Sequence, residues 1–194
     1  MKSSMPKQAR RPAVPIVVEC VSPDVQGGRY PAKRLVGDRL EVGADIFKDG
    51  HDLLAARVRC ETPDGECRTV PMAYDQDRDR WFGSFTLEGI GRWSFTVEAW
   101  TDRFGTWRSG LEKKIAANVD VSLEFLEGAA LIDATARRAR DAAEKVALRA
   151  AALTLRDEGA SLESKSTVAT SEALRRSFDA NYSPEDLTSF AYPL

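Results

Sequence analysis

The two halves of the chain follow different residue patterns, and the change falls near Gly110. Before it, short segments alternate apolar and polar residues and are separated by turn residues. After it, alanine, leucine and charged residues dominate, and apolar residues recur at spacings of three and four. A period of two is typical of strands and a period near 3.6 of helices. The sequence therefore predicts a strand-built part followed by a helical part.

The first part is predicted to be an all-β sandwich. One face of a strand carries Leu40, Val42, Ala44 and Ile46, a second strand carries Ala56, Val58 and Cys60, and Pro63-Asp64-Gly65 should join two antiparallel strands. Six or seven such strands without intervening helices favour the immunoglobulin or fibronectin III type. The lack of a Cys…Trp…Cys arrangement argues against an antibody-like domain, and Trp81 and Trp93 should fill the space between sheets.

The second part is predicted to be an α-helical hairpin or small bundle, which makes the whole chain α+β. A short helix is expected at 111–117, and a long one from the capping residue Asp120 toward Glu158, with Gly128 as a candidate break. The expectation continues with a polar connector at 161–167, a helix at 170–178 and a helix start at 183–186. The predicted organisation is a disordered leader (1–14), a sandwich (15–110), helices (111–180) and a linker start (181–194).

Composition restricts the partners and the compartment. The net charge is −2, so no general field attracts nucleic acid, and no apolar run reaches membrane-spanning length. Three cysteines without a CxxC pair, and no signal-peptide pattern in the first dozen residues, favour a cytoplasmic protein with reduced thiols. We expect neither nucleic acid nor membrane as a partner.

No residue set with catalytic, metal-binding or cofactor-binding spacing is found, so none is predicted. His51 stands in a polar turn, and Gly27-Gly28 is interpreted as a turn only. Cys60 and Cys67 flank a predicted hairpin and are favoured as structural over redox residues. Asp75, Asp77 and Asp79 resemble a calcium loop in outline, but the glycine and glutamate of an EF-hand are out of register.

Four blocks carry a family resemblance: PAKRLVGD (31–38), DGHDLLAA (49–56), VEAWTDRFGTWRSGLEKK (97–114) and FLEGAALI (125–132). Their order and spacing resemble the N-terminal region of bacterial maltosyltransferases, which extend α-1,4-glucans from maltose 1-phosphate and belong with the α-amylase-like glycoside hydrolases. The resemblance implies a β-sandwich with a helical insertion and a missing catalytic barrel that would hold the reactive carboxylates. It implies a non-catalytic module that acts in homodimerisation and active-site positioning during glycogen-like α-glucan synthesis. The α-1,4-glucan would be a partner through the parent enzyme only.

Two functions remain open for the cluster around the strand-to-helix change. It comprises Trp100, Asp102, Arg103, Phe104, Trp107 and Arg108. As a structural junction, its rings and paired charges would join the sandwich to the helices. As a glucan-binding site, Trp100 and Trp107 would stack on sugar rings. The junction is favoured, and the glucan-binding module is the alternative.

Overall fold

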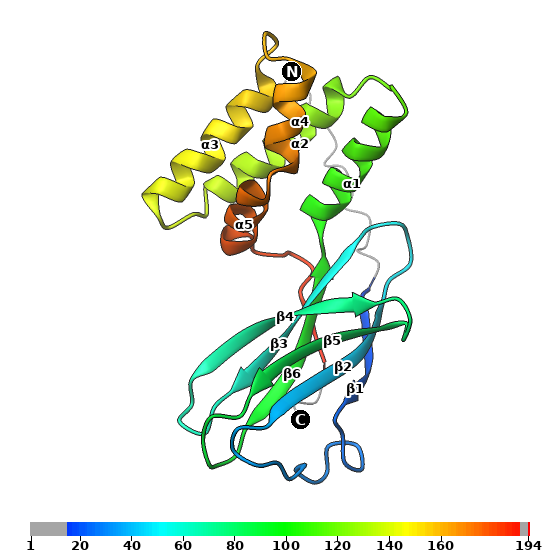
Figure 1. The fold of residues 1–194 in the computed structure, drawn as a ribbon, viewed down its shortest axis with the longest axis vertical. Helices are drawn as coiled ribbons and strands as arrows, with labels where there is room; N and C mark the ends of the chain where they lie inside the picture. The colour runs from blue at the N-terminus through cyan, green and yellow to red at the C-terminus, as the bar shows by residue number, and fades with distance from the viewer. Residues whose placement is uncertain (1–14, 191–193) are drawn as a thin grey trace, which may run out of the picture. The chain divides into compact units, whose positions relative to one another are not determined.

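Seven strands form an antiparallel sheet in the order β1-β2-β5-β4-β3-β6-β7 (Figure 1). The computed structural model describes residues 15–190 and 194; the expected leader at 1–14 lies outside the described residues. Strands β1 and β7 contact each other, so the sheet closes nearly into a barrel. The strands are β1 (Val17–Ser22), β2 (Arg39–Phe47), β3 (Leu54–Glu61), β4 (Cys67–Asp75), β5 (Arg80–Thr86), β6 (Ser94–Thr101) and β7 (Thr188–Ser189).

The residues that alternate with period two in β2 and β3 are buried, as the sequence predicted. Leu40, Val42, Ala44 and Ile46 of β2 are all buried, and so are Ala56, Val58 and Cys60 of β3. The Pro63-Asp64-Gly65 turn joins β3 to β4 as an antiparallel hairpin, in which the Gly65 amide donates to the Thr62 carbonyl at 2.9 Å. Strand β6 differs from a one-sided strand, because both of its faces are buried, including Thr96 and Glu98.

Five helices follow β6 and belong to a second compact unit, formed by residues 101–185 with 52–54, whereas the strands belong to the first. They are α1 (Arg103–Ala116), α2 (Ser122–Ala136), α3 (Ala142–Arg156), α4 (Leu162–Thr170) and α5 (Glu172–Asn181). The chain is therefore a mixed α+β protein. Side chains of Asp102, Asp141, Ser161 and Ser171 each accept a backbone N–H at a helix start, which fixes where α1, α3, α4 and α5 begin.

Several expected helix limits were wrong. Helix α1 begins at Arg103 rather than at Leu111, because Asp102 caps it. The long helix breaks at 137–141 and not at Gly128, since Asp141 starts a new helix there. The expected connector at 161–167 is helix α4, which Ser161 caps. No helix starts at 183–186; the chain instead runs into β7 beside β6.

The helical unit has a core of its own, supplied by all five helices. Its fully buried large side chains include Phe104, Leu111, Ile132, Leu148, Leu155 and Phe178. The small residues Ala129, Ala136, Ala152 and Ala169 lie among them and are also buried, which lets the helices approach closely. An alanine-rich helix that could not bury its apolar stripe alone thus finds its partners within this unit.

Candidate functional site

The predicted cluster is divided between the two units. Trp100 is the residue before the last in β6 and belongs to the strand unit, and the other five residues lie at the start of α1 in the helical unit. Trp100 is half-buried, with the Arg57 guanidinium 5.4 Å from its ring centre. Arg57 in turn pairs with the buried Glu98 at 2.6 Å. The exposed part of this indole is the part available to a ligand.

Asp102 has two structural roles. Its carboxylate accepts the Gly105 amide at 2.8 Å and caps α1, and its other oxygen pairs with Arg175 of α5 at 2.8 Å. The same Arg175 guanidinium lies 5.7 Å from the Phe104 ring and pairs with Asp179 at 2.6 Å. Asp102 thereby ties the first helix to the last.

Phe104 and Trp107 lie in the helical core. Phe104 is fully buried and stacks on Phe178 with 4.7 Å between ring centres. The indole nitrogen of Trp107 donates to the Glu124 carbonyl of α2 at 2.7 Å, and its ring covers Gly128. The indole ring and the indole nitrogen of Trp107 therefore both make contacts inside the helical unit.

Arg103 and Arg108 make surface ion pairs. Arg103 pairs with Glu185 at 3.4 Å. Arg108 pairs with Glu112 at 3.1 Å and with Glu172 of α5 at 3.2 Å, and these hydrogen bonds raise the pKa of its guanidinium further above its usual range. Pairs of this exposure contribute little stability individually, on the order of 0–1 kcal/mol.

The residues that sequence analysis interpreted as structural differ in exposure. His51 is exposed, and Cys20, Cys60 and Cys67 are free thiols. Burial raises the pKa of the Cys60 thiol, which makes its reactive thiolate scarcer. Within residues 15–190 and 194, no cluster of three or more His, Cys, Asp or Glu side chains could hold a metal ion. No helix in this described part is long and apolar enough to cross a membrane.

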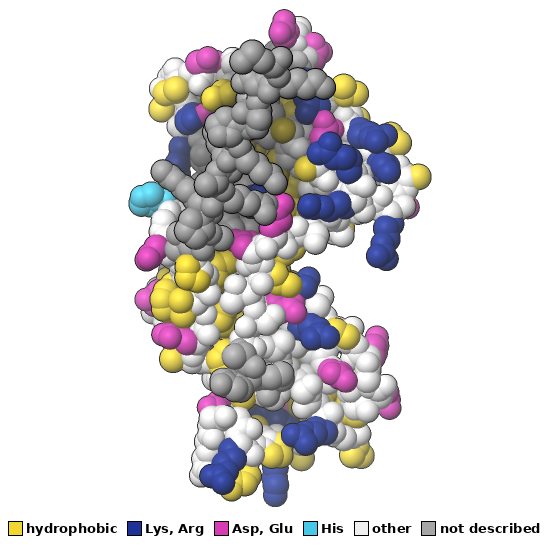
Figure 2. Space-filling model, turned by 180° about the vertical axis from the view of Figure 1, so that it is seen from behind, with side chains coloured by type: hydrophobic (Ala, Val, Ile, Leu, Met, Phe, Trp, Pro, Cys, Tyr) yellow, Lys and Arg dark blue, Asp and Glu magenta, His cyan; other side chains and the backbone are white. Residues whose placement is uncertain are grey.

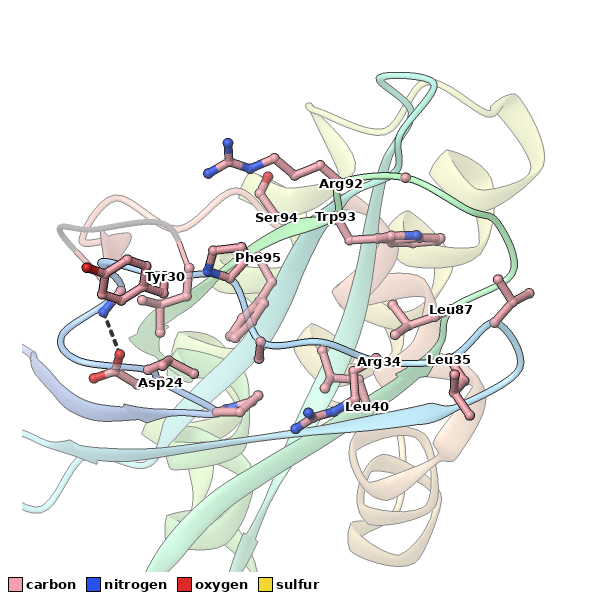
Figure 3. A pocket seen from close by; sticks show the side chains of 18 of the residues that line it. Asp24, Tyr30, Arg34, Leu35, Leu40, Leu87, Arg92, Trp93, Ser94 and Phe95 are labelled. Carbon is pink, nitrogen blue, oxygen red and sulfur yellow. Dashed lines mark hydrogen bonds between the residues drawn. The ribbon is translucent and has the colours of Figure 1, made fainter.

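A cavity that sequence analysis missed opens at one end of the strand unit. Its volume is about 490 Å³, and it is built from the loop between β1 and β2, the loop between β5 and β6, and Leu194 (Figure 3). Leu40, Leu87 and Phe95 are buried in its wall, and Trp93 packs against Phe85 with 5.9 Å between ring centres. Trp93 was expected between sheets; it is instead half-buried and lines the cavity.

Gly28 shapes one wall of this cavity. Its φ of +76° suits glycine, and a Cβ there would lie 2.5 Å from the Leu194 side chain. Asp24 holds the turn, because its carboxylate accepts the amides of Gly27 and Gly28 (Figure 3). The PDVQGG turn was thus a detectable signal, but only the fold shows that it meets Leu194.

Comparison with known proteins gives the family. Residues 14–194 match the family model of alpha-1,4-glucan:maltose-1-phosphate maltosyltransferase, domain N/S. A maltosyltransferase of that name from Myxococcus xanthus is 46% identical over 132 residues, which are 66% of this chain and 20% of that protein. The one from Chlorobaculum tepidum is 43% identical over 128 residues, 65% of this chain and 19% of its own length.

The match extends furthest toward maltosyltransferase 1 of Streptomyces coelicolor among these three relatives, with 40% identity over 156 residues, 77% of this chain and 23% of that protein. The chain spans about a fifth of the length of the relatives it matches. It belongs to the alpha-1,4-glucan:maltose-1-phosphate maltosyltransferase family, in which it corresponds to domain N/S.

Proposed function

We propose that this chain is a non-catalytic module of a maltosyltransferase, and that it acts in dimerisation and in positioning the active site for α-glucan synthesis. The family match and the length of the relatives support a role as one part of a larger transferase. The free thiols fit the cytoplasm as its location.

The outward face of α3 is the observation that favours dimerisation. Val146 is 67% exposed and Leu153, two turns later, is 66% exposed, so both stand on the same face of the helix. Figure 2 shows apolar side chains among Lys and Arg side chains on the side of the helical unit where α3 lies. Apolar residues with a basic rim are typical of surfaces that a partner protein covers.

Light scattering coupled to size-exclusion chromatography tests this proposal on the chain itself. We expect a dimer, and the double variant Val146→Lys/Leu153→Lys should be monomeric because two charges cannot be buried at the contact. Ile90→Lys, at an apolar residue of the strand unit that is 91% exposed, is the control and should stay dimeric. A double variant that remains dimeric, or a parent chain that is monomeric at every concentration, would refute a dimer contact on α3.

The alternative is a glucan-binding module, and the contacts of the two tryptophans limit it. Trp107 uses its ring and its nitrogen inside the helical core, which leaves Trp100 as the ring available for stacking. Calorimetric titration with maltoheptaose distinguishes this function, since Trp100→Ala should abolish binding if the alternative holds. The junction role of the six-residue cluster likewise stays a proposal: the links that Asp102 and Arg108 make to α5 lie within the helical unit, and Trp100 of β6 continues directly into the residues that start α1.

We also infer that the strand unit is an immunoglobulin-like sandwich. Its strand order corresponds to A-B-E-D followed by C-F-G when β1 to β7 are lettered in sequence. The half-buried Trp81 and the buried Phe85 on β5 would then lie in the sheet that contains β2.

A further inference from the structure

The outward face of α3 carries a narrow stripe of apolar and small residues. Helix geometry places Ala142, Val146, Ala150 and Leu153 within about 80° of one another around the helix axis, and all four are exposed. The buried Leu148 lies on the opposite side of the helix. In Figure 1, α3 forms one side of the helical unit. Because two of the four stripe residues are alanines, a second helix can approach this face closely.

The two ends of the stripe carry opposite charges. Arg137 and Arg140 form a basic segment before α3, whereas Asp157 and Glu158 form an acidic end after its last turn. All four side chains are exposed, and none of them forms an ion pair with a residue of the described part of the chain. Asp157 uses one carboxylate oxygen to accept the Gly159 amide at 2.9 Å, which leaves its other oxygen for a partner. A helix that covers the stripe should therefore present acids to the basic segment and cations to the acidic end.

A second copy of α3 meets this requirement when the two helices run in opposite directions. If a twofold axis passes between Arg149 and Ala150, Val146 of one copy faces Leu153 of the other. The basic segment of each copy then lies beside the acidic end of the other copy. Arg149 lies at the edge of the stripe, so the twofold axis places its two copies on opposite sides of the contact. A parallel pair would instead bring like charges together at both ends.

We propose that two copies of this chain pair through antiparallel α3 helices, with the basic segment of each copy against the acidic end of the other. This arrangement rests on the dimerisation of the proposed function, and it specifies which helices meet, in which direction and through which charges. Because these charges lie at the exposed rim of the contact, the dimer should dissociate more readily as salt is added.

Charge reversal tests the pairing of the two ends. Arg137→Glu/Arg140→Glu makes both ends acidic, and Asp157→Lys/Glu158→Lys makes both ends basic. In light scattering, each variant alone should dimerise at least about tenfold more weakly than the parent, because like charges meet twice in each dimer. An equimolar mixture of the two variants should recover the dimer, since the new acids then meet the new lysines. Recovery in the mixture also shows that both variants are folded.

Cysteine substitution tests the direction of the helices in a chain that carries Cys20→Ser/Cys67→Ser. Ala150→Cys lies next to the twofold axis, so two copies should form a disulfide while one molecule of oxidised glutathione is reduced to two thiols. Ala143→Cys is the matched control at another exposed alanine of α3. Its two copies would lie about 20 Å apart along antiparallel helices and should not cross-link.

The outcomes separate this arrangement from dimerisation itself. Cross-links at both alanines would indicate a parallel pair, and no cross-link at Ala150 in a dimeric chain would place the contact on another surface; either result overturns the proposal and leaves dimerisation intact. A mixture that dimerises as weakly as its components would exclude the charge pairing. Arg34→Glu/Arg92→Glu, which reverses two exposed charges of the strand unit, should leave the dimer unchanged. A parent chain that is monomeric at every concentration would contradict the proposed function as well.

Discussion

Substitution by alanine should change the free energy of unfolding in opposite directions at two glycines that lie inside helices. On helix propensity alone, Gly→Ala in a helix interior stabilises by roughly 0.5–1 kcal/mol. At Gly110 of α1 a new methyl group meets nothing within 4 Å, so this gain should appear in full. At Gly128 of α2 the methyl carbon would lie 2.0–2.8 Å from three carbon atoms of the Trp107 indole, which is too close for any real contact.

The Trp107 ring has little room to yield. It lies 5.4 Å from Phe104 between ring centres, and its nitrogen holds the Glu124 carbonyl at 2.7 Å. Overpacking of this kind costs about 1–3 kcal/mol, and loss of the hydrogen bond adds about 1 kcal/mol. Because these costs exceed the propensity gain, Gly128→Ala should destabilise by roughly 1–3 kcal/mol.

Urea unfolding followed by far-UV circular dichroism measures both variants against the parent. We expect the midpoint of the helical transition to rise for Gly110→Ala and to fall for Gly128→Ala, with a difference in unfolding free energy of about 2–4 kcal/mol between them. If Gly128→Ala were as stabilising as Gly110→Ala, Trp107 could not be packed on α2, and the account of the helical core would be wrong.

The remaining predictions concern Asp102 and Glu124. Asp102→Ala should lower the unfolding free energy by about 1–2 kcal/mol through loss of the α1 cap, while Asp102→Asn keeps most of the cap and isolates the Arg175 pair; equal losses in the two variants would contradict a capping role. The Lys114 side chain bonds to Glu124 and lowers its pKa. Since the folded state holds this carboxylate ionised, its stabilisation is present above the unfolded pKa of about 4.3 and is lost as pH falls through the lower folded value. Glu124→Gln should therefore flatten the fall in urea midpoint between neutral and acidic pH, and an unchanged acid dependence would exclude this pair as a contributor.

Local patterns predicted the strands well because each strand was marked independently of the others. The alternation of β2 and β3 and the Pro63-Asp64-Gly65 turn needed only neighbouring residues for their interpretation. The limits of the helices were harder to predict, since a helix can begin wherever a side chain accepts a hydrogen bond from the first turn. Asp102 and Ser161 are such caps, and both lie outside the helices predicted from apolar spacing.

The features that could not be predicted depend on contacts between residues that are far apart in the sequence. Trp93 looks like a core residue by its alternation with Phe95, but its ring is only half-buried and lines the cavity. Trp107 could be assigned to a core only once Gly128 was known to lie beneath it. The cavity depends on the contact of Gly28 with Leu194, two residues that are far apart in the sequence, and no local pattern predicts such a contact. The domain limits expected from the sequence stay a prediction.

The pairing of Ala99 with Thr188 makes the helical unit, topologically, the loop of a β-hairpin. If residues 100–187 were unstructured, closing this hairpin would cost about 2.5 kcal/mol more in chain entropy than closing a five-residue loop. Prior folding of the helices removes most of that penalty by shortening the free chain between the two strands. The last strand should accordingly join the sheet late, so that completion of the strand unit reports whether the insertion has folded.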